Sequence, residues 1–160
     1  MNEFKHLKET LEQYANDVKN LYQDNLVKDD ATASGELLNS VKYILNFNAK
    51  TFEVSLSLLD YWKYVENGRR AGKFPPPDKI KRWIEIKPVL PRPYNGKLPT
   101  IDQLTYLICR KIKLEGIKPR PLLKSTLNEI NKEYENKISE ALTQDLENDL
   151  DSIFALITTR

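Results

Sequence analysis

The feature of this 160-residue chain that most constrains its fold is the apolar pattern of its last third. Apolar residues return there at steps of three or four, which places them on one face of an α-helix. The members of this pattern are Leu123, Leu127, Ile130, Tyr134, Ile138, Ala141, Leu142, Leu146, Leu150, Ile153, Phe154 and Ile157. One helix and two helices fit this spacing equally well. As one helix, residues 125–160 span roughly 54 Å, so the helix projects from a domain of ordinary size and needs a partner for its apolar face.

The N-terminal part of the chain predicts a second long helix, over about residues 2–27. Its apolar residues also recur at steps of three and four, and polar residues such as Glu12 and Lys19 occupy the opposite face. The apolar members are Phe4, Leu7, Leu11, Tyr14, Val18, Leu21 and Tyr22. The single histidine, His6, falls on the polar face, so we expect it to be exposed to solvent.

Residues 37–59 predict a β-hairpin, because apolar and polar residues alternate on both sides of a short loop at residues 48–50. The alternating apolar residues are Leu37, Val41, Tyr43, Leu45, Phe47, Phe52, Val54, Leu56 and Leu58. One face of the hairpin has to be covered, and the N-terminal helix is the obvious cover. We therefore expect an α+β fold, with a long N-terminal helix packed on a small antiparallel sheet. Residues 1–124 form one domain, and residues 125–160 are a helical extension of it.

The middle of the chain is irregular and rich in proline. Seven of the nine prolines and three of the five glycines lie in residues 58–99. A short helix is expected to start at Pro77, since proline fits the first turn. Its apolar face is formed by Ile80, Trp83 and Ile84. Residues 89–99 are expected to be a loop.

A third helix is predicted over residues 100–114. Thr100 fits its N-cap and Gly116 its C-cap. Its buried stripe is expected to consist of Leu104, Leu107, Ile108 and Ile112. The linker that follows, residues 116–121, is expected to be extended because each residue before a proline avoids the helical region.

The residue inventory argues against an enzyme and against a metal site. The chain holds one cysteine, Cys109, and one histidine, whereas a structural zinc site takes about four such ligands. Cys109 lies in an apolar helical run, so we expect a buried, inert thiol. Phosphate-binding loops, nucleophile elbows and paired-histidine metal motifs are missing from the sequence, so no cofactor is expected. No segment is apolar enough to span a membrane, and the charged N-terminus is not a secretory signal. We therefore expect a protein made and kept in the cytoplasm.

Charge is distributed unevenly along the chain, although the net charge is only +2. Residues 1–60 hold six basic and ten acidic residues, and residues 125–160 hold three and eight. Residues 61–97 hold ten basic and three acidic residues, and residues 98–124 hold six and two. The basic middle is compatible with a nucleic-acid contact, with a contact to an acidic neighbouring subunit, or with a plain solvated surface.

Aromatic residues are interleaved with these basic residues. Trp62, Tyr64, Phe74, Trp83 and Tyr94 alternate with lysines and arginines between residues 62 and 97. Such a mixture can bind single-stranded nucleic acid by pairing phosphates and stacking bases. The spacing of Trp83 with Ile80 and Ile84 favours a place in the core instead. Because no recognised nucleic-acid-binding motif accompanies the patch, soluble nucleic-acid binding is the alternative hypothesis.

Four pieces of the sequence form a pattern that is specific through their order and spacing. The first runs from Asp60 through Tyr61-Trp62-Lys63-Tyr64-Val65-Glu66-Asn67-Gly68-Arg69-Arg70-Ala71-Gly72-Lys73-Phe74 to Pro75-Pro76. The others are Ile80 with Trp83-Ile84, then Leu107-Ile108-Cys109-Arg110-Lys111-Ile112, and last Glu115-Gly116-Ile117-Lys118-Pro119-Arg120-Pro121-Leu122-Leu123. In this order and spacing the four pieces resemble the neck or tail-completion proteins of tailed bacteriophages. Cys109 stands where that family usually has a small alanine and Leu122 where it often has phenylalanine. The long acidic C-terminal helix is not a general feature of that family.

The resemblance implies a non-catalytic virion protein. Such proteins form a ring of six or twelve copies, contact portal or adaptor and tail proteins, and surround the DNA channel. They are made in the host cytoplasm and end up in the neck or tail of the virion. The expected contact loop comprises Arg69, Arg70, Lys73 and Phe74, anchored by Tyr61 and Tyr64. The C-terminal helix is expected to clasp a neighbouring subunit through Leu142, Leu146, Leu150 and Ile153.

Overall fold

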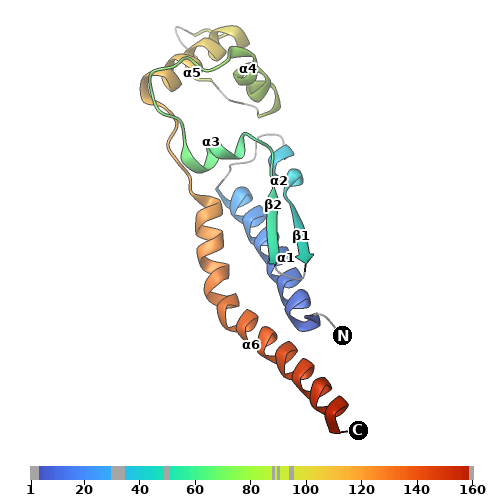
Figure 1. Cartoon of the computed structure of the whole chain (residues 1–160). Helices are drawn as coiled ribbons and strands as arrows, with labels where there is room; N and C mark the ends of the chain where they lie inside the picture. The colour runs from blue at the N-terminus through green and yellow to red at the C-terminus, as the bar shows by residue number, and fades with distance from the viewer. Residues whose placement is uncertain are drawn as a thin grey trace. The chain divides into compact units, whose positions relative to one another are not determined.

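The protein has a helix-rich α+β fold with one two-stranded antiparallel sheet, shown in Figure 1 as a computed structural model. The structure describes residues 4–29, 35–48, 51–87, 89, 91–93 and 96–158. In chain order the elements are α1 (Lys5–Lys28), α2 (Glu36–Ser40), β1 (Lys42–Asn48), β2 (Thr51–Ser57), α3 (Trp62–Asn67), α4 (Pro77–Ile86), α5 (Ile101–Glu115) and α6 (Leu122–Thr158). The predicted α+β class, with long helices at both ends of the chain, is confirmed.

These elements form two compact units. The first unit holds the described parts of residues 1–25, 41–57 and 123–160, so it contains most of α1, the hairpin and nearly all of α6. The second unit holds the described parts of residues 26–40 and 58–122, with α2 to α5.

The C-terminal apolar pattern forms one helix rather than two, since α6 runs for 37 residues. It lies antiparallel to α1, as three contacts along the pair show. The Asn25 side chain donates a hydrogen bond to Oγ1 of Thr126 (2.9 Å), and the Tyr14 and Tyr134 rings meet edge-to-face with centroids 5.4 Å apart. Near the start of α1, the His6 ring nitrogen Nδ1 forms a hydrogen bond with the Asp145 carboxylate. Beyond Asp145, α6 continues past the N-terminal end of α1 (Figure 1).

The core of the first unit lies where α1, α6 and the hairpin meet. Val18, Ile130 and Tyr134 are buried at its centre. Partly buried apolar residues surround them, namely Tyr14, Leu21, Leu56, Leu127 and Ile138. The helical stripes predicted for both ends of the chain thus cover each other for the length of α1.

The hairpin is shorter than the predicted range of 37–59. β1 and β2 pair from Lys42 opposite Ser57 to Asn48 opposite Thr51. Residues 36–40 form the short helix α2, because Leu37 and Val41 are four positions apart and satisfy helical spacing as well as alternation. Both side chains are buried. The Ser40 hydroxyl donates to the carbonyl of Leu37 (2.8 Å), which closes this turn.

In the second unit, α4 packs against α5. The predicted caps of α5 are confirmed, since Thr100 and Gln103 form a reciprocal capping box and Gly116 follows its last turn. Two burial predictions are wrong. Trp83 is 37% exposed and Leu107 is 50% exposed, because each helix buries one narrow stripe, centred on Ile84 in α4 and on Thr105 and Cys109 in α5. The short helix α3 was not predicted.

Candidate functional site

Two backbone segments of the second unit, which begin at Gly68 and Gly116, cross in close contact. Arg69 and Ile117 exchange two backbone hydrogen bonds, N–H of Arg69 to O of Ile117 (2.9 Å) and N–H of Ile117 to O of Arg69 (2.8 Å). Gly68 and Gly116, each directly before one of these residues, have φ of +65° and +74°. A Cβ on Gly68 would lie 2.2 Å from O of Ile117, and one on Gly116 would lie 2.2 Å from O of Arg69. Only glycine permits both the backbone conformation and this approach.

The loop after this crossing is held by its own arginine. The Arg69 guanidinium donates to the carbonyls of Lys73 (3.2 Å) and Phe74 (3.4 Å), and the Gly72 N–H donates to the carbonyl of Lys113 (2.7 Å). The Phe74 ring lies 6.0 Å from that of Tyr106 in α5. The Arg69 side chain is half-buried and stabilises the loop through these hydrogen bonds.

The hydrogen bonds of Arg69 bring it together with Lys73 and Phe74 at the predicted contact loop. The other residues predicted for this loop are exposed. Arg70, Lys73 and Phe74 present side chains to solvent. Tyr61 and Tyr64 are exposed at the start of α3 and on it, where the Tyr64 N–H donates to the Tyr61 carbonyl (3.0 Å). The loop is therefore held by the hydrogen bonds of Arg69 and presents basic and aromatic side chains to solvent.

The two units carry opposite charge. Within the residue ranges of the second unit there are 16 basic and 9 acidic residues, a formal net charge of +7. Within those of the first unit there are 9 basic and 14 acidic residues, a net charge of −5. Each unit thus offers a surface that attracts the opposite charge on another molecule.

One face of α5 combines apolar and basic side chains. Leu107 is 50% and Leu114 is 65% exposed. They are seven positions apart, with Arg110 and Lys111 between them at helical steps. Lys111 lies 3.9 Å from Glu115, a solvated pair of little energetic weight. Sequence reasoning missed this face because it placed Leu107 in the core.

The last turns of α6 present an exposed apolar stripe. Leu146, Leu150 and Ile153 follow one another at steps of four and three, continuing Leu142, and each is exposed. The helix packs on α1 through a different face, which buries Tyr134, Ala141 and Asp145. The four residues predicted to clasp a neighbour thus all lie on an open face.

A buried carboxylate of α6 caps the first turn of α1. Asp145 Oδ1 accepts from the backbone N–H of His6 (3.1 Å), and Oδ2 accepts from that of Leu7 (2.8 Å). N–H groups in the first turn of a helix have no partner within it. Burial would raise the pKa of Asp145, but the hydrogen bonds from Leu7 and His6 outweigh it and hold the pKa below its ordinary value. The predicted exposure of His6 is wrong, since its ring is half-buried against this carboxylate.

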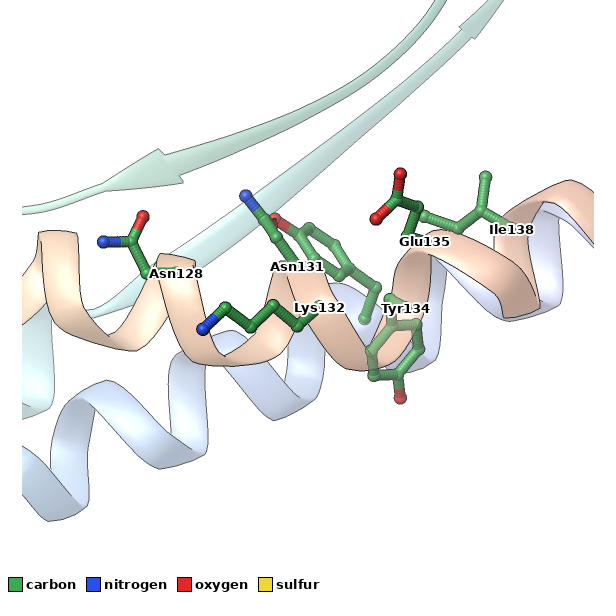
Figure 2. Close-up of a pocket in the computed structure, with 7 residues that line it drawn as sticks. Asn128, Asn131, Lys132, Tyr134, Glu135 and Ile138 are labelled. Carbon is green, nitrogen blue, oxygen red and sulfur yellow. Dashed lines mark hydrogen bonds between the residues drawn. The ribbon is translucent and has the colours of Figure 1, made fainter.

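A pocket of about 660 Å³ lies beside α6 (Figure 2). Tyr14 and six residues of α6 line it, namely Asn128, Asn131, Lys132, Tyr134, Glu135 and Ile138. The Tyr14 hydroxyl donates to Oδ1 of Asn131 (2.8 Å), and burial raises the pKa of Tyr14. Figure 2 shows the Tyr134 ring pointing to the opposite side of α6 from the Glu135 carboxylate. The polar side chains of this lining are two tyrosines whose pKa is raised, two amides, one lysine and one glutamate.

Other chemistry-bearing groups of the described chain are scattered or buried. The residues that the structure describes contain no cluster of three or more His, Cys, Asp or Glu side chains able to hold a metal ion. Cys109 is fully buried, as predicted, and burial raises the pKa of its thiol. None of the described helices is long and apolar enough to cross a membrane.

Comparison of the chain with protein-family models, with curated proteins and with solved structures finds no match.

Proposed function

We propose that this protein is a non-catalytic structural subunit of a tailed bacteriophage, part of the neck or tail-completion ring that joins head to tail. The observation that carries the proposal is the crossing of Arg69 and Ile117. It joins two separate pieces of the sequence that resemble this family, and it gives a physical reason for a glycine in each. A further two pieces lie on α4 and α5, which pack together.

The charge distribution supports a ring. Copies related by rotation in a closed ring meet through two unlike surfaces. A unit of net charge +7 and one of −5 on the same chain supply such a pair. The exposed loop around Arg70 and Lys73 remains available for portal, adaptor or tail proteins and for passing DNA. A loop with fixed geometry loses little conformational entropy on docking.

Quantitative mass spectrometry of purified tailed particles from the source culture tests the proposal. We expect about six or twelve copies per particle, referred to the major capsid protein. Absence from particles, with the protein found free in the cell, would overturn the virion assignment.

A matched pair of variants tests the contact loop. Arg70→Ala with Lys73→Ala removes two exposed charges without touching the Arg69 hydrogen bonds. Lys28→Ala with Lys42→Ala removes two exposed charges elsewhere. We expect the first pair to reduce assembly of infectious particles and the second to leave it unchanged. Equal infectivity of both variants would show that the loop makes no contact that assembly needs.

The basic second unit favours one alternative, a soluble nucleic-acid-binding protein. Tyr64 and Phe74 are exposed in the same unit as Arg70 and Lys73, and exposed aromatic rings can stack on bases. This function requires an affinity for duplex DNA whose log–log slope against salt is about −0.9 per phosphate contacted. Measuring that slope for the purified protein, together with the particle analysis, separates the two functions.

A further inference from the structure

We propose that the C-terminal end of α6 in one copy docks on the Leu107–Leu114 face of α5 in a second copy, as the repeated head-to-tail contact of the ring. We call the first surface the acidic tail (residues 142–157 of α6). We call the second the basic face (Leu107, Arg110, Lys111 and Leu114 of α5). The inference deepens the proposed function and rests on it for closure into a ring.

The apolar stripe of the acidic tail, formed by Leu146, Leu150, Ile153 and Ile157, is exposed to solvent. Asp145 of α6 binds the first turn of α1, and the 13 residues from Leu146 to Thr158 continue the helix by roughly 20 Å. All described side chains from Leu150 to Ile157 are exposed. Leu146, Leu150, Ile153 and Ile157 lie on one face at steps of four, three and four. A stripe of this kind normally lies in a hydrophobic groove or against another helix.

The charges beside the stripe argue against pairing with a second acidic tail. Residues 138–158 contain five acidic residues and no basic one. Glu147 precedes Leu150 by three positions, and Asp151 continues the same row, so both border the stripe. Two tails packed against each other would bring these like charges together, which destabilises helix pairs. The occupant of the stripe therefore has to be apolar and basic.

The basic face of α5 has that chemistry. Leu107 and Leu114 supply exposed apolar surface, and Arg110 and Lys111 lie between them on the same side of the helix. Among the residues that the structure describes, the Arg110 side chain has no hydrogen-bond or ion-pair partner, and Lys111 has only its solvated pair with Glu115. Leucines of one helix can pack on leucines of the other while the flanking charges pair.

Such a contact suits a ring. One helix against one helix face buries an area at the low end for stable complexes, below about 1,200 Å². Each contact is then weak between two free copies. A closed ring, in which every copy gives one tail and receives one, holds many such contacts at once and gains from their high effective concentration.

Reciprocal charge reversal tests the contact. The tail variant carries Glu147→Lys and Asp151→Lys, and the face variant carries Arg110→Glu and Lys111→Glu, all at exposed positions. Association of the full chain is measured by analytical ultracentrifugation at low salt over a concentration series. A control variant with Glu129→Lys and Glu135→Lys has the same change in net charge as the tail variant, at exposed positions of α6 outside the acidic tail.

We expect the unaltered chain and the control to self-associate, and each reversed variant to lose at least about tenfold in association constant. An equimolar mixture of the two reversed variants should recover to within about threefold of the unaltered chain, because every tail then meets a face of opposite charge. An unaltered chain that stays monomeric, or a mixture that fails to recover, would overturn the contact. The contact would also be overturned if the tail variant associated more strongly with the unaltered chain than the unaltered chain associates with itself, because that result would show tail-to-tail pairing. The mass spectrometry of particles is independent of these results. If it found about six or twelve copies per particle while the mixture of variants failed to associate, the proposed function would hold and the ring would be formed by a different contact.

Discussion

The Asp145 carboxylate lies 2.7 Å from Nδ1 of His6, 139 positions away in the sequence. The same carboxylate accepts the backbone N–H groups of His6 and Leu7. The first turn of α1 is thus capped by a residue of α6 rather than by its own N-cap. The contact joins the two long helices of the first unit at the first turn of α1.

Replacing Asp145 by alanine is expected to destabilise the first unit by about 1–2 kcal/mol, because two N–H groups of α1 lose their acceptor. Urea unfolding followed by circular dichroism measures the change. Asp151→Ala, at an exposed position of the same helix, is the control and should be neutral within about 0.5 kcal/mol. Equal effects of the two substitutions would contradict the capping role.

Stability should also depend on pH through Asp145. Its pKa is lowered in the folded protein, so the ionised carboxylate stabilises the fold above the unfolded-state pKa of about 3.9. That contribution is lost as pH falls through the lower, folded-state pKa. Asp145→Asn resembles the protonated acid in shape. The difference in unfolding free energy between the native chain and this variant should be largest above about pH 4 and shrink at lower pH. A difference independent of pH would contradict this origin.

Gly68→Ala is expected to damage the second unit more than Gly72→Ala. Both glycines have positive φ, so both substitutions strain the backbone. The added Cβ at position 68 would meet O of Ile117 at 2.2 Å, whereas the one at position 72 would meet no atom within 4 Å. We expect an extra cost of about 1–3 kcal/mol at position 68, with faster hydrogen exchange at the amides of Arg69 and Ile117. Equal costs would show that the close crossing carries no weight.

The elements that could be predicted from sequence are those whose periodicity extends over many turns. The stripes of α1 and α6 leave no doubt about helices, because a 3.6-residue repeat is sampled many times. Five residues are too few to distinguish the two periods, and Leu37 with Val41 fits a strand as well as the helix α2. Trp83 and Leu107 show a second limit, since an apolar residue at the edge of a helical stripe is buried only if a neighbouring element covers it.

The candidate site was predictable in part for a related reason. Gly68, Arg69 and Gly116 stand in recognisable motifs, but their crossing depends on tertiary structure that no local pattern encodes. Asp145 looks like an ordinary solubilising acid on a helix, and only its partners on α1 distinguish it from Asp151. The basic face of α5 was hidden by the assumption that Leu107 is buried.

Cys109 should be unreactive in the native protein. It is fully buried, and burial raises the pKa of its thiol while the positive charge of Arg69 lowers it less. Reaction with a thiol reagent then requires local opening. We expect a rate at least about 100-fold below that of the unfolded chain, which corresponds to about 2.7 kcal/mol of opening free energy. A chain carrying Cys109→Ser and Ser152→Cys, with its thiol at an exposed position, should react at nearly the unfolded rate.

Truncation separates the part of α6 that stabilises the fold from the part that is free to bind. A chain ending at Asn148 keeps Ala141 and Asp145, which are buried, and loses mainly exposed residues. Its thermal midpoint should stay within about 2 °C of the full chain, since surface changes cost little. A chain ending at Lys137 loses both buried residues, so its midpoint should fall by about 4 °C or more. If the truncation at Asn148 lowered the thermal midpoint as much as the truncation at Lys137, the end of α6 would have to be packed within the fold, and its apolar stripe would not be available to a second molecule.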